Sequence, residues 1–410
     1  MARICLIRQG HYPQDTRLNK EVEALVGTGH DVDIICGGMA SQPRSERHGH
    51  IAVHRVPIAR GRGNPVRYAL RYGAFLVAAT FLAGKLHLRR RYDLVQVNSL
   101  PDFLVFAALV PRVMGARVLL NLLECTPEFF AMKYRLPARH VLVRFVKLVE
   151  RASIAFADRV ITCNDPMRDT FLEHGAPANK VAVIMLSADE ATFDPSRFPE
   201  APKGPGDPFV ISYHGTLEES LGADTVVRAV GVLKDEIPDL RLRIFGDGTL
   251  RPVIEALVKD LGLEDRVLLA RGFVPIPELL EGIASADAGV VPTKRNAYRD
   301  LTHSSKMFDL IAMRKPAIVA RTRSVEAYFD DSCLQLFESA NEHDLARAIR
   351  ELYADPGLRE RLVRRATEVS EPYRWVHQRA RYLAIVDELI SRADARQARP
   401  TVVAEGAEDA

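Results

Sequence analysis

Three groups of residues have side chains or backbone suited to ligand chemistry. The first is Gly246-Asp247-Gly248, which follows a strand-like run and opens a helical pattern, so its backbone N–H groups could face an anion at a helix N-terminus. A plain strand-to-helix turn needs such glycines as well. The chain contains neither G-x-G-x-x-G nor G-x-x-x-x-G-K-S/T, which counts against a standard dinucleotide site and a P-loop.

The second group is Lys306 with Asp309, three residues apart within a predicted helix. Side chains at this spacing share one helix face. They either pair with each other or present a cation and a carboxylate to a ligand.

The third group lies in the N-terminal half, where predicted strands end. His11 follows the first strand in a loop, and we expect it to face a ligand rather than bulk solvent. Asp15, with Arg17, either contacts a ligand or serves as the N-cap of the first helix. Glu124 and Glu128 follow a later strand, where a carboxylate is costly unless it is paired or contacts ligand hydroxyls.

The elements that must position these residues form two series. Short β-branched runs alternate with helix-length amphipathic segments, which predicts parallel sheets built from βαβ units. The first series has predicted strands at 3–8, 31–37, 52–57, 93–99, 117–123, 159–164 and 181–186, with helical spacing over 15–26 and 137–157. The second series has predicted strands at 209–215, 241–246, 267–274, 288–293, 316–321 and 333–337.

The 410 residues are therefore predicted to form an α/β protein of two Rossmann-like, doubly wound parallel-sheet domains facing a central cleft. The segment between the two series contains five Pro and reads as a linker. The expected boundaries are 1–193 for the N-terminal domain, 194–208 for the linker, 209–372 for the C-terminal domain, 373–394 for a helix that crosses back to the first domain, and 395–410 for a disordered tail.

Composition limits the class of protein and its location. With 47% hydrophobic and 27% charged residues, the chain has enough apolar surface to form packed cores. The five cysteines are odd in number and widely separated, and no apolar run reaches the roughly 20 residues of a membrane span, which favours a cytoplasmic protein with reduced thiols.

Charge is divided unevenly along the chain. Residues 1–190 carry a net charge of +9 and the remainder −6. The segment 47–92 holds ten Lys or Arg and no acidic residue around an apolar run. This pattern is typical of a helix on an anionic membrane or of a groove for a phosphorylated acceptor. The alternative is a helix buried against its own sheet with a solvated basic collar.

Ordered segments over most of the chain resemble the family 4 glycosyltransferases of the GT-B fold. In the C-terminal half, the matching segments are 213–217 with Gly222, 244–248, 271–275, 286–292, 305–309 and Lys315-Pro316. In the N-terminal half they are Asp15-Thr16-Arg17 with Glu21, Ala24-Leu25 and 29–32, and Pro127-Glu128-Phe129-Phe130.

The resemblance implies transfer of a sugar from a nucleotide sugar, with retention at the anomeric carbon by front-face displacement and without a metal or other cofactor. The donor would bind the C-terminal domain and the acceptor the N-terminal domain. The basic, apolar 47–92 segment adds the expectation of a lipid-linked or saccharide acceptor of the cell envelope or of an exopolysaccharide. We expect no nucleic acid partner. Binding of the basic 47–92 segment to an anionic membrane surface would place the protein on the inner face of the plasma membrane.

The resemblance also assigns residues. For the donor they are Gly215, Thr216, Gly246, Asp247, Phe273, Val274, Ser304, Ser305, Lys306 and Asp309, with Lys306 as the cation for the diphosphate, Phe273 and Val274 beside the base, and Asp309 on the ribose. For the acceptor they are His11, Asp15, Arg17, Asn98, Glu124 and Glu128. The expected catalytic groups are Lys306, Glu124 and His11, and no metal ligands are expected.

The chain departs from the family pattern at five positions. Asp309 is one methylene shorter than the Glu that the family has there. Leu301 stands where the family has a Glu near the transferred sugar, and Leu123 where many members have a His. Thr216 and Leu221 replace an Arg and a Lys that bind the diphosphate. Each charge-assisted hydrogen bond lost in this way weakens donor binding by roughly 1.5–3 kcal/mol. Another basic side chain could replace it, and the candidates are Lys306, His303, Lys294 and Arg295.

These departures leave a second hypothesis open, that of a catalytically impaired GT-B-fold protein that binds nucleotide sugar or partners an active transferase. A nucleotide-sugar epimerase of the same fold is a weaker alternative. The sequence leaves undetermined the sugar, the base, the acceptor, the linkage and the oligomeric state.

Overall fold

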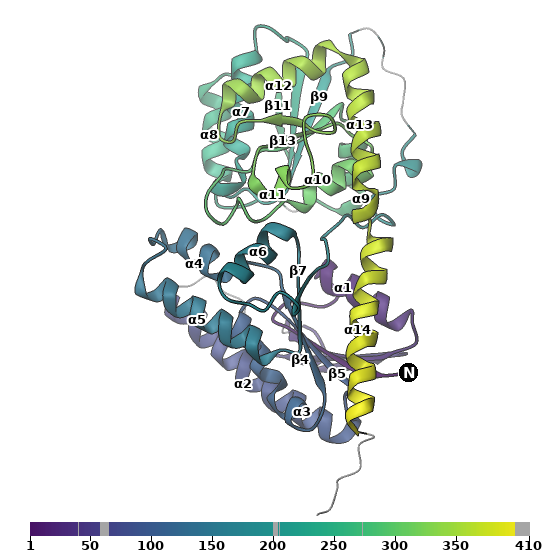
Figure 1. Cartoon of the computed structure of the whole chain (residues 1–410). Helices are drawn as coiled ribbons and strands as arrows, with labels where there is room; N and C mark the ends of the chain where they lie inside the picture. The colour runs from purple at the N-terminus through teal and green to yellow at the C-terminus, as the bar shows by residue number, and fades with distance from the viewer. Residues whose placement is uncertain (40, 58–64, 200–203, 205, 273, 398–410) are drawn as a thin grey trace, which may run out of the picture. The chain divides into compact units, whose positions relative to one another are not determined.

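The computed structural model describes residues 1–39, 41–57, 65–199, 204, 206–272 and 274–397. Its contacts divide the chain into two compact units. The first unit comprises 1–163, 168–184 and the chain from 379 onward, and the second comprises 164–167 and 185–378. Both units are largely parallel sheets covered by helices, and Figure 1 labels many of their elements.

The first unit is built on an eight-stranded sheet of order β3-β4-β2-β1-β5-β6-β7-β8. All neighbouring strands are parallel except β3 and β4, which pair antiparallel. The central strands are apolar on both faces, as expected for a sheet covered by helices on both sides. The strands are β1 (Arg3–Arg8), β2 (Asp31–Gly37), β3 (Ser45–His48), β4 (Ile51–Val56), β5 (Leu94–Asn98), β6 (Arg117–Leu122), β7 (Arg159–Thr162) and β8 (Val181–Val183).

The helices of the first unit follow its strands in βαβ order. They are α1 (Thr16–Val26), α2 (Pro65–Arg90), the 3-10 helix η1 (Asp102–Ala108), α3 (Leu109–Val113), α4 (Thr126–Tyr134), α5 (Val141–Phe156) and α6 (Asp165–Glu173). Among the described residues, no helix is long and apolar enough to cross a membrane.

The last helix, α14 (Trp375–Gln397), contributes to the core of the first unit. Tyr382, Val386 and Leu389 recur at helical spacing and are buried. The hydroxyl of Tyr382 donates to Gln96 Oε1 at 2.7 Å. The amide of Gln96 donates in turn to the buried carboxylate of Glu21 at 2.8 Å. This chain of hydrogen bonds fixes the helix to the middle of the sheet.

The second unit is built on a six-stranded parallel sheet of order β11-β10-β9-β12-β13-β14. Its strands are β9 (Phe209–His214), β10 (Leu240–Phe245), β11 (Val267–Leu269), β12 (Ala288–Val291), β13 (Ala317–Ala320) and β14 (Gln335–Phe337). Its helices are η2 (Pro195–Arg197), η3 (Glu219–Leu221), α7 (Ala223–Leu233), α8 (Arg251–Asp260), α9 (Ile276–Ala284), α10 (Ser305–Ala312), α11 (Arg323–Glu326), α12 (Glu342–Ala354), α13 (Pro356–Ser370) and η4 (Glu371–Tyr373).

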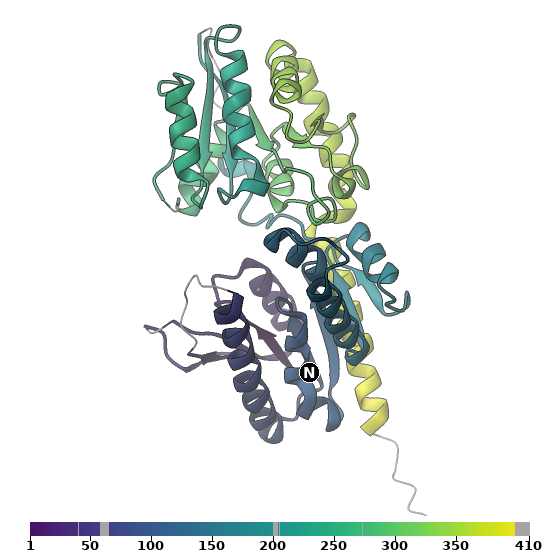
Figure 2. The same cartoon turned by 90° about the vertical axis from the view of Figure 1, so that its left-hand side faces the viewer.

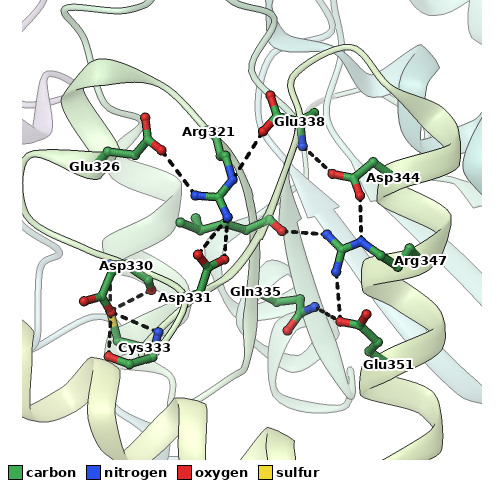
Figure 3. Close-up of polar contacts among 12 residues, drawn as sticks. Arg321, Glu326, Asp330, Asp331, Cys333, Gln335, Glu338, Asp344, Arg347 and Glu351 are labelled. Atoms are coloured by element: carbon green, nitrogen blue, oxygen red, sulfur yellow. Dashed lines mark hydrogen bonds and ion pairs between the residues drawn. The ribbon is translucent and has the colours of Figure 1, made fainter.

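Two arginines connect the ends of β13 and β14 to α12 in a network of ion pairs (Figure 3). Arg321 pairs with the carboxylates of Glu326, Asp331 and Glu338. Arg347 pairs with those of Asp344 and Glu351 and donates to the Leu336 carbonyl oxygen at 3.1 Å. Because most of these groups are partly exposed, the network orders the loops more than it adds stability.

The predicted strands are all present, and the differences lie at their ends. β11 stops at Leu269 rather than 274, because the following residues include Gly272 with φ +66° and Pro275. β14 begins at Gln335 rather than 333, since Cys333 belongs to a turn closed on Asp330. The prediction missed β3, whose four polar residues carry no apolar alternation.

The predicted linker and the predicted disordered tail both overlap helical segments of the structure. The predicted linker 194–208 contains η2, and Phe198 packs against the core of the second unit. The predicted disordered tail begins at 395, whereas α14 runs to Gln397, and 398–410 lie outside the described residues.

Candidate functional site

The second sheet has its topological switch point at β9. The chain adds β10 and β11 on one side of β9 and then returns to add β12, β13 and β14 on the other. Ligands of open α/β sheets bind at the carboxyl ends of the strands at such a point. Here those ends lead into Gly215 after β9 and into the loop that begins α10 after β12.

The glycines of the 246–248 segment allow two turns to touch. Gly215 N donates to the Phe245 carbonyl oxygen, and Leu217 N to the Asp247 carbonyl oxygen, each at 3.0 Å. A Cβ atom on Gly246 would lie 1.8 Å from the Gly215 carbonyl oxygen, which no side chain tolerates. A Cβ on Gly248 would lie 2.3 Å from the Leu217 carbonyl oxygen. Close backbone approach therefore explains these glycines.

The N-terminus of α10 brings Lys306 next to Gly215. Ser304 caps the helix by accepting a hydrogen bond from Lys306 N at 3.3 Å. The Cε atom of Lys306 lies 3.7 Å from the position that a Cβ atom on Gly215 would occupy. A cation, the N-terminus of a helix and a glycine turn thus meet at one point, which is an arrangement suited to a diphosphate.

Asp309 lies one turn further along α10 and is 5% exposed. Its Oδ2 atom is 3.6 Å from Lys306 Nζ and 3.3 Å from His214 Nε2. Burial lowers the pKa of His214, although the hydrogen bond with Asp309 opposes this effect. Asp309 is therefore already paired on one side, and its expected contact with a ribose stays a prediction.

The other predicted donor residues are spread around this point. Thr216 is exposed beside Gly215, and Val274 is half-buried in the loop before α9. Ser305 accepts from Lys306 Nζ at 3.4 Å. Asp247 is exposed, and its Oδ1 atom lies 2.9 Å from Nε of Arg251, the first residue of α8. The predicted base contact Phe273 lies outside the described residues.

Arg299 is a cation that the sequence reasoning did not consider. Its Nε and Nη2 atoms donate to Ser220 Oγ at 3.1 and 3.0 Å, within η3 and next to Leu221. Leu221 is one of the positions where the family pattern expects a basic residue. No local pattern indicates this contact, because the two segments are 79 residues apart in the chain.

The replacement cations that the sequence suggested have other partners. Lys294 Nζ pairs with Asp224 at 2.6 Å, and Arg295 Nε with Asp300 at 2.9 Å. His303 lies 3.4 Å from the amide of Asn164 and its ring contacts Phe308 edge-on. Three other basic side chains contact the turns of this site. Lys306 lies beside Gly215, Arg299 contacts Ser220, and Arg251 donates to the Gly246 carbonyl oxygen at 3.1 Å.

The first unit has its own pocket at the corresponding switch point, between β1 and β5. The cavity is about 490 Å³ and is bounded by the segments that follow β1, β5 and β6 and by the start of α2. Four of the six predicted acceptor residues line it, namely His11, Asp15, Arg17 and Glu124.

Two further arginines line the same pocket and were not predicted. They are Arg8, at the end of β1, and Arg71, in α2. Arg8 forms an ion pair with Asp15 and donates to the Ser99 carbonyl oxygen at 2.7 Å. Asp15 also caps α1 by accepting from Leu18 N at 3.2 Å, so its capping role and its place in the pocket coexist.

The remaining predicted acceptor residues do not line this pocket. Asn98 is buried, and its amide donates to Glu21 at 2.6 Å. Glu128 faces His174, with 3.4 Å between its Oε1 atom and His174 Nε2, and His174 also contacts the buried Glu150 at 2.6 Å. Burial opposes protonation of His174, but hydrogen bonds with the two carboxylates raise its pKa to about 9. Asn98 and Glu128 therefore have partners within this unit, and their expected contact with the acceptor stays a prediction.

Over the described parts of the chain, no three His, Cys, Asp or Glu side chains gather in a way that could hold a metal ion.

Comparisons with known proteins match both units. Residues 14–186 match the model of the glycosyl transferase 4-like domain, and residues 208–355 match that of glycosyl transferases group 1. The chain is 26% identical to a D-inositol 3-phosphate glycosyltransferase of Paenarthrobacter aurescens, over 59% of this chain and 60% of that protein. It is also 26% identical to a GDP-mannose-dependent phosphatidylinositol monomannoside mannosyltransferase of Mycolicibacterium smegmatis, over 48% of this chain and 51% of that protein.

These curated relatives are matched over only about half to three fifths of their length. Solved structures are similar over nearly the whole chain. Sucrose-phosphate synthase from Thermosynechococcus elongatus superposes with a TM-score of 0.74 at 20% identity, covering 96% of this chain and all of that one. Anabaena HepE in complex with UDP gives 0.69 at 15% identity, covering 95% and 100%. At this identity the likeness shows the fold.

Proposed function

Because the chain belongs to the family 4 glycosyltransferases of the GT-B fold, we propose that it transfers a sugar from a nucleotide sugar to a lipid-linked or saccharide acceptor of the cell envelope or of an exopolysaccharide. The observation that carries this proposal is the meeting of Gly215, the N-terminus of α10 and Lys306 at the switch point of the second sheet.

The donor diphosphate would bind at this point. A departing nucleoside diphosphate develops negative charge, and a helix N-terminus with an adjacent ammonium group stabilises that charge without the aid of a metal. Lys306 Nζ supplies the positive charge, and Asp309 can accept hydrogen bonds from sugar hydroxyls beside it. HepE, a structural neighbour, has been solved with UDP and with UDP-glucose, which supports a nucleotide-sugar donor.

The acceptor would bind in the pocket of the first unit. His11 and the carboxylates of Asp15 and Glu124 can hydrogen-bond to hydroxyl groups there. Arg8, Arg17 and Arg71 give the same pocket an excess of positive charge, which suits an acceptor that carries a phosphate. The curated relatives named for inositol phosphate and phosphatidylinositol monomannoside are consistent with such an acceptor.

The proposed reaction retains the configuration of the anomeric carbon and needs no metal. In a front-face displacement, the acceptor hydroxyl attacks from the side on which the diphosphate departs, and a phosphate oxygen of the leaving group takes the hydroxyl proton. Lys306 would hold the departing diphosphate, while Glu124 and His11 would orient the acceptor. Turnover is then expected to persist in EDTA and to give a product of the same anomeric configuration as the donor.

A second candidate function rests on Leu123 and Leu301. Both side chains are buried and apolar, so neither can hydrogen-bond to the transferred sugar. A protein that binds nucleotide sugar without turning it over, as partner to an active transferase, would show this feature. Donor binding without nucleoside diphosphate release in any acceptor mixture, with copurification of a second transferase, would favour this alternative.

Substitution of the donor-site residues tests the main proposal. We expect Lys306→Ala and Asp309→Ala each to lower the affinity for the nucleotide sugar at least tenfold, because each removes a charged contact worth roughly 1.5–3 kcal/mol. Lys259→Ala, on the exposed last turn of α8, serves as the control and should leave affinity unchanged. Equilibrium titration measures all three. Unchanged affinity in both site variants would refute the donor-site assignment.

A further inference from the structure

The outer face of α2 carries an apolar line that nothing in the described structure covers. Leu70, Val77, Phe81 and Leu88 are between 62% and 74% exposed. Their spacings of seven, four and seven residues place them within an arc of about 40° around the helix. A helix that serves only to cover a sheet presents polar residues on this side. The inner face of α2 is apolar and buried, as Phe75, Ala79 and Ala83 show.

Two neighbouring helices extend this line into a surface. α2 and α5 both pack against η1, and α3 continues η1 beside α2. Figure 2 turns this side of the first unit toward the viewer and shows α2, the η1–α3 segment and α5 next to one another. α5 exposes Val141, Leu142, Phe145 and Leu148, and α3 exposes Leu109 and Val113.

We call these ten exposed apolar side chains the α2–α3–α5 face. Among the described residues of the first unit, the only other large apolar side chain that is similarly exposed is Met1. The exposed apolar surface of this unit is thus concentrated on one side, which marks an interaction site rather than chance exposure.

The charges around this face have one sign. Segment 47–92 has no acidic residue, and segment 109–149 has only Glu124 and Glu128, which lie in the pocket and against His174 respectively. Glu150, on α5, is fully buried. The exposed basic side chains on and beside the three helices include Arg67, Lys85, Arg89, Arg139, Arg144 and Arg151.

We propose that the α2–α3–α5 face docks on an anionic membrane surface, with Phe81 and Phe145 entering the headgroup–acyl boundary and the basic side chains contacting lipid phosphates. Apolar side chains flanked by lysine and arginine are the composition that binds such an interface. Self-association through this face would bring two basic surfaces together, so charge favours a lipid occupant over a second copy of the chain.

Docking of this face would also bring the acceptor pocket to the lipid. The first turns of α2 supply Arg71, Tyr72 and Phe75 to the pocket wall, while Leu70 and Val77 of the same turns lie on the docking face. A lipid-linked acceptor could then present its polar head to the pocket while its chain remains in the bilayer. This link rests on the proposed function, whereas membrane binding itself does not.

Flotation of the full chain with vesicles tests the proposal without donor or acceptor. Vesicles of phosphatidylcholine alone are compared with vesicles of phosphatidylcholine and phosphatidylglycerol, whose negative surface attracts basic segments. We expect binding to the anionic vesicles and at least tenfold weaker binding to the neutral ones. Binding should weaken as salt is raised, since part of the attraction is electrostatic.

Two pairs of substitutions separate the apolar and charged contributions. Phe81→Ser with Phe145→Ser, and Lys85→Glu with Arg144→Glu, should each reduce binding to anionic vesicles at least tenfold. Val253→Ser with Leu268→Ser, at exposed apolar positions of the second unit, should leave it unchanged. An unaltered circular dichroism spectrum and an unaltered thermal unfolding midpoint verify that each variant is folded.

Three results would overturn the proposal. They are failure of the folded wild type to bind either vesicle, equal binding of the wild type and both face variants, and a concentration-dependent dimer that Phe81→Ser with Phe145→Ser abolishes in the absence of vesicle binding. The last would identify a second copy as the occupant. Loss of vesicle binding with retained sugar transfer to a water-soluble acceptor would separate this surface from the reaction itself.

Discussion

Single residues decide whether the donor site can form, and Gly246 is the most constrained of them. Its Cβ position lies 1.8 Å from the Gly215 carbonyl oxygen, so any side chain would force apart the turns after β9 and β10. Sequence reasoning identified this glycine but left open whether it served a ligand or a turn. The structure shows that it allows close approach of the backbone that carries Gly215, which no inspection of the sequence alone could reveal.

We expect Gly246→Ala to lower the free energy of unfolding by about 1–3 kcal/mol, the usual cost of overpacking, and to weaken nucleotide-sugar binding at least tenfold. Gly73→Ala is the matched control, because no atom lies within 4 Å of its Cβ position and its helical backbone suits alanine. Denaturant unfolding and donor titration measure the two effects. Equal behaviour of the two variants would contradict this account of Gly246.

Arg299 is expected to replace one of the basic residues missing at 216 and 221. Its contact with Ser220 places a guanidinium beside η3, near the turn after β9. Arg299→Ala should weaken binding of a nucleoside diphosphate about tenfold, while binding of the nucleoside alone changes little. Arg295→Ala, whose side chain pairs with Asp300, should affect neither. Loss of nucleoside and diphosphate binding to the same extent would contradict a phosphate contact.

At the scale of elements, a buried carboxylate holds together α1, two strands and α14. Glu21 accepts hydrogen bonds from Gln96, Asn98 and Asn121, and Gln96 accepts one from Tyr382 of α14. The helical pattern over 15–26 predicted α1, and the apolar runs predicted β5 and β6. The network was not predictable, since residues that are hydrogen-bonded to each other in it are separated by up to 286 residues in the chain.

This network should make stability depend on pH. Burial raises the pKa of Glu21 from 4.5 to about 7, against the hydrogen bond from Asn98. The folded state therefore holds this proton more tightly than the unfolded state. The resulting stabilisation is present below about pH 4.5 and is lost as the pH rises through 7.

Glu21→Gln should remove this part of the pH dependence. Relative to the wild type, the variant is expected to gain on the order of 2–3 kcal/mol in its free energy of unfolding between pH 5 and pH 8. Urea unfolding at several pH values measures the difference between the two proteins, which cancels the contributions of other titrating groups. A difference that does not change with pH would show that Glu21 has the same pKa in both states.

At the scale of the whole molecule, the sequence predicted the class of fold and nearly every strand, because alternating β-branched runs and amphipathic segments are local patterns. The two α/β series also predicted ligand sites at the carboxyl ends of the strands, whereas most of the proposed site residues came from the family resemblance and stay predictions. Asn98 and Glu128 were assigned to the acceptor through the family resemblance, and Glu128 also because it follows a strand end. The structure gives them buried or paired partners that only the packed unit brings together.

The α2–α3–α5 face could likewise be predicted only in part from the sequence. The sequence indicated a basic, apolar segment at 47–92 and left open whether its helix was covered. It gave no indication that α5, more than fifty residues later, adds its own exposed line of apolar side chains to the same surface.

The most direct test of the central claim is a thermal-shift screen of the purified chain against UDP-, GDP-, dTDP- and ADP-sugars, with nucleoside diphosphate release measured in the presence and absence of a membrane lipid extract. The account predicts a rise in the unfolding midpoint with one nucleotide family and release that depends on the lipid extract. No rise with any of these nucleotide sugars would contradict the donor site built around Gly215 and Lys306.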